Sequence, residues 1–374
     1  MKNVGIITMH KIINYGSALQ AYALQTYIER LGYKCTLIDY AYPNEFHLNG
    51  NNRKLSCKKI FMGLRYRLLM SLFYHKREQV KKFEKFWKDN FHLTKPFLCR
   101  RDLFGAPPSF DLYVTGSDQV WNPRHMKGDS SFFCDFIKNG ANRIAYAASI
   151  SSKQLHGQYL DLYESFFNKY SAIGVREKSA VGLVSSLSGQ KTVWVCDPTM
   201  LLRVEDYSLM ASSSVIREQE PYLLIYILGY NFNPHPMVDI VVEKIANRYG
   251  LKKIYLQCNN VEGLGKKSCK MISAAGPNEF LYLFKNASFV ITSSFHGTVY
   301  SLLFEKQFIS LSSMDDDRIP SLLEFMRLED RLVVNKSDIV DFEKIDFTKV
   351  RPLLEAFRNS SEKFLKESIT KYIL

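Results

Sequence analysis

Short apolar runs alternate with segments of helical periodicity along almost the whole chain. In the first half, apolar runs with the length of a buried strand stand at 4–9, 35–40, 110–116, 143–151, 171–175 and 192–198. The segments 17–32 and 157–169 lie between such runs and have a helical pattern of apolar residues. Because uninterrupted apolar strands are typical of sheets covered on both faces, this half predicts a parallel sheet with helices on both sides.

The same alternation starts again in the second half. Strand-like runs and helical patterns follow each other at 222–228, 236–249, 252–258, 277–286, 288–294, 297–305, 307–312 and 320–328. A stretch rich in serine and charge, 203–220, separates this block from the first. We therefore expect an α/β protein with two doubly wound Rossmann-type domains that face each other across a cleft.

The predicted domain boundaries follow from this pattern. Residues 1–205 form the N-terminal domain, which carries a basic helical insert at about 50–95, and residues 219–345 form the C-terminal domain. The remaining 346–374 is helical in pattern, and we expect it to cross back onto the first domain.

The positive charge is concentrated in one segment. The chain has a formal net charge of +13, and Arg53–Lys88 contains twelve Lys or Arg against two Glu, with Leu, Phe and Trp at roughly helical intervals. One interpretation is a solvated face above a core stripe. The other is a surface that binds an anionic membrane or an acidic glycan. Nucleic acid is not expected as a partner, because no recognisable nucleic-acid module accompanies the charge.

The cysteines and the apolar runs indicate the compartment. The seven cysteines are scattered and show no paired CxxC spacing, which favours reduced thiols over a disulfide framework or a zinc site. The N-terminus runs directly into a strand-like VGII, and no apolar run approaches the roughly 20 residues that span a bilayer. We expect a cytoplasmic protein, with peripheral attachment to the inner face of the cytoplasmic membrane as the alternative. The oligomeric state, a homo-oligomer included, stays open.

One candidate for chemistry follows the strand-like run at 288–294. The sequence FVITSSFHGT places Ser293, Ser294 and His296 after apolar residues and before a helical pattern. In α/β proteins this position brings reactive side chains to the carboxyl end of the sheet. The alternative is a histidine that caps a helix or bonds a neighbouring carbonyl.

Two further polar turns follow strands of the first half. Asn14, Tyr15, Gly16 and Ser17 stand before the first helix, where they either contact an anion or sugar or form an ordinary tight turn. The stretch TGSDQVWNP contains Ser117, Asp118, Gln119 and Trp121. It predicts either a sugar-facing loop, in which Asp118 accepts a proton from a hydroxyl, or an Asx-turn with Trp121 in the core.

Two arginines follow strands and are candidates to hold an anion. Arg176 comes directly after the run at 171–175, and Arg318 follows the run at 307–312. A guanidinium can bind a carboxylate or phosphate with two hydrogen bonds, although a salt bridge to a neighbouring acid is the alternative. The three aspartates at 315–317 suggest a metal, but consecutive loop residues seldom converge on one ion, so no metal is expected.

Taken together, these segments resemble the polysaccharide pyruvyl transferases. Over roughly 3–335 the chain carries, in this order, NYGSALQAYALQ, FDLYVTGSDQVWN, IAYAASIS, VREKSAV, VCDPTMLL and ITSSFHGTVYSLLF. The resemblance implies a GT-B-like fold. It also implies transfer of a pyruvyl group from phosphoenolpyruvate to two hydroxyls of a sugar in a cell-surface or capsular polysaccharide precursor, with formation of a ketal and release of phosphate.

The resemblance also assigns roles. His296 matches the histidine of the family's Arg-Leu-His signature, but Ser294 and Phe295 precede it, so the signature's arginine is absent. Arg176 matches the arginine of the first domain, and Arg318 lies where a further cation is expected. The resemblance does not settle the role of Asp118. From the chemistry of the reaction we expect it to be a second proton-transfer group or an anchor for an acceptor hydroxyl.

The implied partners are phosphoenolpyruvate as the donor and a sugar or lipid-linked oligosaccharide as the acceptor, with no cofactor. The acceptor is expected on the first domain and the donor on the second. The alternatives are a GT-B glycosyltransferase that uses a nucleotide sugar, and a glycan-binding relative without activity.

Overall fold

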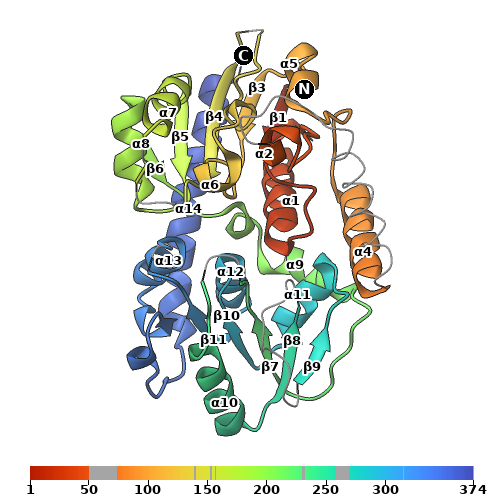
Figure 1. Ribbon diagram of the computed structural model, residues 1–374, viewed down its shortest axis with the longest axis vertical. Coiled ribbons are helices and arrows are strands. Elements are labelled where there is room, and N and C mark those ends of the chain that lie inside the picture. Colours follow the sequence, from red (N-terminus) through yellow and green to blue (C-terminus); the bar gives the residue numbers. More distant parts are fainter. Residues whose placement is uncertain are drawn as a thin grey trace.

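The computed structural model describes residues 1–49, 74–138, 140–151, 154–155, 157–229, 232–257, 269–314 and 316–373. Two α/β domains lie end to end, each built around a parallel six-stranded sheet (Figure 1). The prediction of two doubly wound α/β domains is confirmed.

The first sheet has the strand order β2-β1-β3-β4-β5-β6. Its strands are β1 (Asn3–Ile7), β2 (Lys34–Leu37), β3 (Leu112–Thr115), β4 (Asn142–Ala148), β5 (Ala172–Val175) and β6 (Thr192–Trp194). The helices of this part are α1 (Tyr15–Arg30), α2 (Glu45–Asn49), α4 (Tyr74–Asn90), α5 (Arg100–Gly105), α6 (Pro123–Met126), α7 (Tyr159–Phe167) and α8 (Ala180–Ser188), with 3-10 turns η1 (Ser130–Phe133) and η2 (Pro198–Met200). All four residues of β3 are buried, as a strand covered on both faces requires.

The second sheet has the order β12-β11-β10-β7-β8-β9. Its strands are β7 (Tyr222–Tyr226), β8 (Lys252–Leu256), β9 (Cys269–Ile272), β10 (Phe289–Thr292), β11 (Gln307–Leu311) and β12 (Leu332–Val333). Around it lie α9 (Val204–Ser212), α10 (Met237–Tyr249), α11 (Pro277–Asn286), α12 (Phe295–Leu303), α13 (Arg318–Met326), η3 (Glu329–Arg331) and η4 (Lys336–Asp338).

Two elements lie where the sequence predicted loops. Helix α9 occupies the expected linker 203–220, because the Asp206 carboxylate accepts a hydrogen bond from the Arg203 backbone N–H and Tyr207 is buried. Strand β9 lies between the runs at 252–258 and 277–286, where the sequence pattern indicated no strand. It is an edge strand with two exposed central residues, so its apolar signal is weak.

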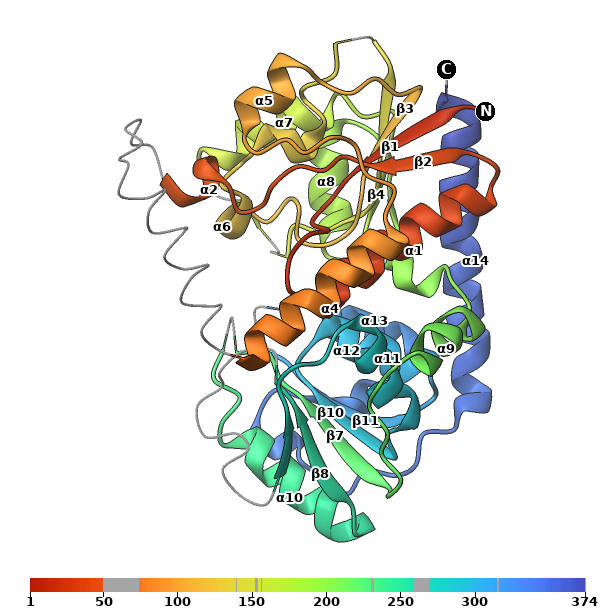
Figure 2. The same cartoon turned by 90° about the vertical axis from the view of Figure 1, so that its right-hand side faces the viewer.

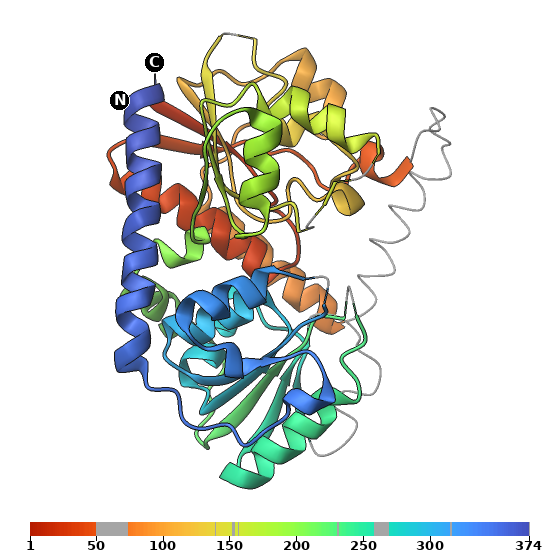
Figure 3. The ribbon, with the colours of Figure 1, turned by 90° about the vertical axis from the view of Figure 1, so that its left-hand side faces the viewer.

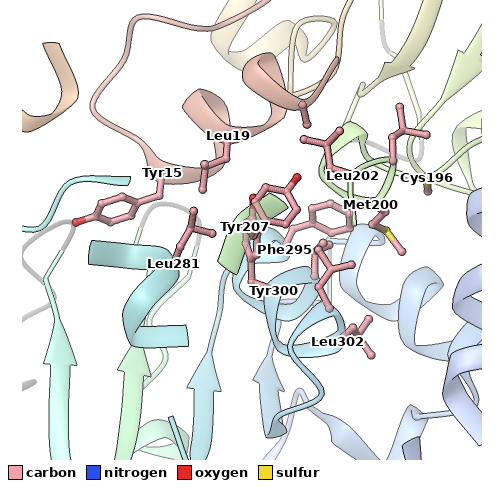
Figure 4. Close-up of a cluster of buried hydrophobic side chains, with 14 of the residues drawn as sticks. Tyr15, Leu19, Cys196, Met200, Leu202, Tyr207, Leu281, Phe295, Tyr300 and Leu302 are labelled. Atoms are coloured by element: carbon pink, nitrogen blue, oxygen red, sulfur yellow. The ribbon is translucent and has the colours of Figure 1, made fainter. Parts of the chain in front are cut away.

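The two domains share one hydrophobic core at their junction. Tyr15 and Leu19 of α1 lie in one buried cluster with Leu281 of α11 and Tyr300 of α12, as Figure 4 shows. The Tyr15 ring stacks on Phe280 with ring centroids 4.7 Å apart. The position of one domain relative to the other is therefore fixed by apolar packing.

The last helix, α14 (Phe347–Tyr372), runs along both domains (Figures 2 and 3). Ser361 Oγ accepts a hydrogen bond of 2.8 Å from the Cys196 backbone N–H, and the Tyr372 carbonyl accepts one of 2.9 Å from Asn142 Nδ2. A Cβ atom at Gly174 would come within 2.7 Å of the Phe364 ring, so β5 and this helix are in close contact. The helix thus covers part of the first sheet.

The predicted basic insert is described only in part. Residues 50–73 lie outside the described residues, whereas 74–90 form α4, which lies beside α1 and α11 (Figure 2). The Phe83 side chain is fully buried, and Lys82 pairs with Glu279 of the second domain at 3.1 Å. The apolar stripe of α4 is therefore core, which favours the solvated-face interpretation for this helix. In the described part of the chain, no helix has both the length and the apolarity needed to cross a bilayer.

Candidate active site

A cavity of about 320 Å³ lies between the two domains. Its walls come from loops that follow strands of both sheets. The lining residues are Met9, Ile12, Ile13, Asn14, Ser17, Tyr42, Asp118, Gln119 and His125 of the first domain, and Leu228, Phe232, Ser293, Ser294, Phe295, His296, Ser313, Asp316 and Arg318 of the second.

Three helices begin at this cavity. Asn14 caps α1 by accepting a hydrogen bond from the Ser17 N–H, and Ser294 caps α12 by accepting one from the Gly297 N–H. Helix α13 starts with Arg318, which also lines the cavity. Because helix N-termini carry free N–H groups and partial positive charge, their convergence makes the cavity favourable for an anion.

His296 lies between the two domains with a carboxylate behind it. It is the second residue of α12 and only 8% exposed. Its enclosed Nε2 atom lies 3.4 Å from Oδ2 of Asp197 in the first domain, which is an ion-pair distance, although the pair lacks the alignment of a hydrogen bond. The prediction had placed His296 at a strand end but had not identified this partner.

Gly16 is the reason that the imidazole can lie so close to the first domain. A Cβ atom at this position would come within 2.0 Å of Nδ1 and 2.4 Å of Cγ of His296. A glycine here allows the close approach that the sequence predicted, and the group that approaches is His296; the substrate contact of Gly16 stays a prediction. The missing side chain makes room for the histidine.

Asp197 connects several groups behind the cavity. Its Oδ2 accepts hydrogen bonds from Ser117 Oγ and Arg176 Nη1, each at 3.0 Å, and its Oδ1 accepts one of 3.0 Å from the Thr199 N–H. Burial alone would raise the pKa of Asp197, but His296 and then Arg176 outweigh burial and hold the pKa well below its ordinary value. A negative charge therefore stays beside the imidazole.

Asp118 lines the cavity from the first domain. Ser17 Oγ donates a hydrogen bond to its Oδ2, and the Gln119 N–H donates one of 2.9 Å to its Oδ1. Burial would raise the pKa of Asp118, but Arg176 and then His296 outweigh it and lower the pKa. Asp118 is therefore ionised at neutral pH.

Arg176 lies behind the cavity wall and does not line it. Its side chain is fully buried. Besides the bond to Asp197, Nη2 of Arg176 lies 3.7 Å from Oδ1 of Asp118, and Cζ of Arg176 lies 4.8 Å from the centroid of the Phe295 ring. The structure corrects the prediction of a direct substrate contact, because the guanidinium is the counter-charge of two buried carboxylates. The Arg176 guanidinium of the first domain lies over the Phe295 ring. Phe295 directly follows Ser294, which stands where the family signature has its arginine.

Arg318 is the guanidinium that reaches the cavity. Its Nε and Nη2 donate to Asp316 at 2.9 and 2.7 Å. Burial would lower the pKa of Arg318, but Asp316 outweighs burial and raises it, so the charge persists. His125 lies on the same cavity. Burial and then Arg318 lower its pKa, so its imidazole is neutral at neutral pH.

Sequence comparison decides the family. The family model described as polysaccharide pyruvyl transferase matches residues 14–316, which include Asp118, Arg176, Asp197 and His296 but not Arg318. The chain belongs to this family. A search of curated proteins gives no match.

Solved structures agree on the fold. Arabidopsis thaliana UGT89C1 complexed with quercetin is similar with a TM-score of 0.52 and 12% identity, over 100% of both chains. The UDP-GlcNAc 2-epimerase from Neisseria meningitidis bound to UDP-GlcNAc is similar with a TM-score of 0.51 and 10% identity, over 99% of this chain and 100% of the other. The GT-B-like fold predicted for this pyruvyl transferase family member is confirmed.

Three of the predicted substrate contacts of this transferase are structural. The Trp121 ring is fully buried, stacks on Phe133, and its Nε1 donates to the Phe132 carbonyl. Tyr15 is also fully buried, in the shared core, and Ser117 bonds Asp197. The sugar-platform interpretation of Trp121 is therefore wrong, and the alternative of a core residue holds.

The other predicted residues divide into supports and cavity walls. Ser293 Oγ accepts a hydrogen bond of 2.8 Å from the Leu228 N–H, and Ser294 caps α12, so both support the wall that they line. Gln119 lines the cavity and accepts a bond from Asn122 Nδ2. Among the described residues, no group of three or more His, Cys, Asp or Glu side chains is arranged to hold a metal ion.

Sequence reasoning assigned no role in this transferase's site to several of its polar residues, and it considered Asp316 only as part of a metal site. Asp197 supports His296, and Tyr42, His125 and Asp316 line the cavity. Asp197 ends the run 192–198, and His125 follows the polar turn at 115–123, so a closer inspection of strand ends would have found both. No sequence motif around Tyr42 indicates that it lines the site.

We expect Gly16→Ala to lower the turnover of this transferase by about 100-fold without unfolding it. The added Cβ displaces the His296 imidazole, and a displacement of about 1 Å can reduce a rate by this factor. Steady-state kinetics and thermal melting measure the two effects. Gly182→Ala is the matched control, because it also lies in a helix and its Cβ meets no atom within 4 Å. Equal rates for the two variants would contradict the steric role of Gly16.

Proposed function

We propose that this transferase moves a pyruvyl group from phosphoenolpyruvate to two hydroxyls of a sugar in a polysaccharide precursor, with formation of a cyclic ketal and release of phosphate. The observation that carries the proposal is the His296 imidazole, which lies between the domains with Asp197 behind it and an anion-favouring cavity in front. The family match supports this donor and its chemistry, and the site offers groups that the chemistry needs.

The donor brings two anionic groups into the cavity. Phosphoenolpyruvate carries a carboxylate and a phosphate, and the N-termini of α12 and α13 together with Arg318 offer positive charge on the second domain. In our proposal the donor therefore binds on this side. Asp316 fixes the orientation of the guanidinium.

The acceptor binds on the first domain in our proposal. Asp118 lies on that side of the cavity as an ionised carboxylate and can accept a hydrogen bond from a sugar hydroxyl. Efficient proton transfer requires a group whose pKa lies near the working pH. Because the pKa of Asp118 is lowered, we assign it to anchoring the acceptor rather than to proton transfer.

The reaction removes two protons from the sugar hydroxyls and delivers one to the methylene carbon of the donor and one to the departing phosphate. The methylene carbon of the donor receives a proton and becomes a methyl group, while one sugar oxygen bonds the neighbouring carbon and loses its proton. The bond from this carbon to the phosphate oxygen then breaks through an oxocarbenium-like centre. The second sugar oxygen bonds the same carbon, and its proton leaves with the phosphate. We assign the proton transfers to His296, with Asp197 as the positioning residue that holds the imidazole.

Phosphate release tests this proposal directly. We expect release only when phosphoenolpyruvate and a sugar with suitably placed hydroxyls are both present, with a ketal methyl signal in the product's proton NMR spectrum. Oligosaccharides in free and lipid-linked form are the acceptors to compare, and activity should persist in EDTA. Transfer from a nucleotide sugar instead would indicate a glycosyltransferase. Glycan binding without release in any combination would indicate a non-catalytic relative.

Arg318→Gln should weaken phosphoenolpyruvate binding by about 10- to 150-fold. This factor corresponds to the loss of a charge-assisted contact of about 1.5–3 kcal/mol. Titration calorimetry with phosphoenolpyruvate measures it. Arg351→Gln is the control, because Arg351 forms a similar two-bond pair with Glu305 on the exposed surface. Unchanged donor affinity in Arg318→Gln would place the donor elsewhere.

A further inference from the structure

A second cavity, of about 610 Å³, lies in the C-terminal part of the chain. Its walls come from the end of α13, the turn η3, the segment 340–346 and the first turns of α14. Arg331 of this cavity directly precedes β12, whereas the residues of the interdomain cavity follow β10 and β11. Because these strands are parallel, the two cavities lie at opposite ends of the strands of the second sheet: the second cavity at their amino ends and the interdomain cavity at their carboxyl ends.

The second cavity contains a buried guanidinium whose hydrogen-bonding capacity is only partly used. Arg331 is 3% exposed and lines the cavity. Its Nη2 donates to the Glu343 carbonyl at 2.6 Å and lies 2.9 Å from Oδ2 of Asp330. Its Nε and Nη1 have no hydrogen-bond partner among the described residues. A buried donor without a partner is unfavourable, so two donor atoms of a cation are available to an acceptor that enters.

Four basic and four acidic side chains line this cavity, and they differ in how they are paired. Asp341 is turned toward Lys244 at 2.9 Å, and Asp346 accepts the N-cap hydrogen bond of α14. Arg327 and Lys344 stand exposed at the cavity, and neither forms an ion pair with a described residue. Glu343 is the acid that offsets part of this charge, and Lys349 lies 3.7 Å from Asp346. The preference for an anion therefore rests on the two donor atoms of Arg331 that have no partner and on Arg327 and Lys344, which form no ion pair with a described residue.

The remaining walls are apolar. Leu328, Phe342, Ile345 and Val350 are buried residues of this cavity, and the Arg331 guanidinium lies 5.9 Å from the Phe342 ring centroid. A volume of this size is typical of a site for a small organic molecule rather than for a single ion. An apolar wall beside donor groups fits a ligand with an apolar body and one anionic end.

We propose that this second cavity binds a small amphipathic anion, with its carboxylate or phosphate on Arg331 and its apolar body against Phe342 and Ile345. The site is separate from the proposed transfer reaction and does not depend on it. Lys344 and Arg327 attract the anionic end, and their exposure allows the ligand to enter between them.

Phenyl phosphate is the probe, because it combines a phosphate with an apolar ring. Titration calorimetry on the full chain should show a binding component that Arg331→Met weakens by about 10- to 150-fold, the factor for one charge-assisted contact. Arg318→Gln, in the other cavity, should leave this component unchanged. Inorganic phosphate should bind this site more weakly than phenyl phosphate, and phenol should not bind it. Equal affinity for phenyl phosphate and inorganic phosphate would overturn the amphipathic assignment.

Arg331→Met should stay folded, because the side chain of its ion-pair partner Asp330 is 55% exposed and stays hydrated when the guanidinium is removed. If it does not fold, Lys344→Gln still tests the site. We expect it to weaken phenyl phosphate binding several-fold, whereas Lys336→Gln, an exposed change outside the cavity, should have no effect. Absence of a component sensitive to Arg331→Met, or unchanged affinity in Lys344→Gln, would overturn the proposal.

Discussion

His296→Ala is expected to lower the rate of pyruvyl transfer by about 10²- to 10⁴-fold, the range for loss of one general acid or base. The imidazole contacts the cavity and Asp197 and contributes little to the shared core, so the variant should remain folded. Single-turnover phosphate release measures the chemical step, and titration with phosphoenolpyruvate measures binding separately. The rate should fall far more than the affinity, because His296 acts in the transition state rather than as a charge that holds the donor.

The control for this variant is His92→Ala. The His92 side chain is 69% exposed and pairs with Glu29 away from the cavity, so its loss should leave the rate unchanged. A rate close to that of the wild type in His296→Ala would exclude the histidine from the chemistry. Loss of folding in this variant would show that the imidazole is mainly a structural link between the domains.

Arg176→Met is expected to lower the free energy of unfolding by about 3–5 kcal/mol, which is the typical effect of removing one partner of a buried ion pair. The change leaves Asp197 without its guanidinium and removes the positive charge near Asp118. Urea denaturation at neutral pH measures the effect. Lys178→Met is the matched control two residues away, because Lys178 and Glu324 form an exposed pair that contributes at most about 1 kcal/mol.

The difference in free energy of unfolding between the wild type and Arg176→Met should change with pH in a defined direction. His296 and then Arg176 hold the pKa of Asp197 below its unfolded value of about 3.9, so this carboxylate stabilises the wild type above that pH. The stabilisation is lost as the pH falls through the folded pKa. Because Arg176→Met lacks part of it, the difference between wild type and variant should narrow in acid. A difference that stays constant would contradict the role of Arg176 as counter-charge.

The sequence was sufficient for the architecture because burial leaves a strong pattern. Strands covered on both faces are apolar throughout, as β3 and β10 are, and helices such as α11 and α14 begin and end where their apolar periodicity does. Strand β9 escaped prediction because an edge strand buries few side chains. Helix α9 escaped because its serines are typical of loops, whereas the burial of Tyr207 decides its structure.

The site was predictable only in its position. Strand ends located His296 and Asp118, but whether a polar residue faces the cavity or lies behind it depends on packing between distant segments. Arg176 and Asp118 both follow strands, yet one side chain is enclosed and the other lines the cavity. The role of Gly16 could not be predicted for the same reason, because it depends on packing against His296, which lies 280 residues further along the chain.

The crossing of α14 has a consequence for synthesis on the ribosome. The strands of the first sheet are complete at Trp194, but Phe364, which packs against Gly174, is translated only after every strand of the second sheet. Part of the apolar surface of the nascent first domain therefore stays exposed to solvent while the second domain is translated. We therefore expect folding to be completed only after α14 has been translated, and we expect a chain that stalls before Phe347 to require chaperones and to be degraded rather than to accumulate as a finished domain.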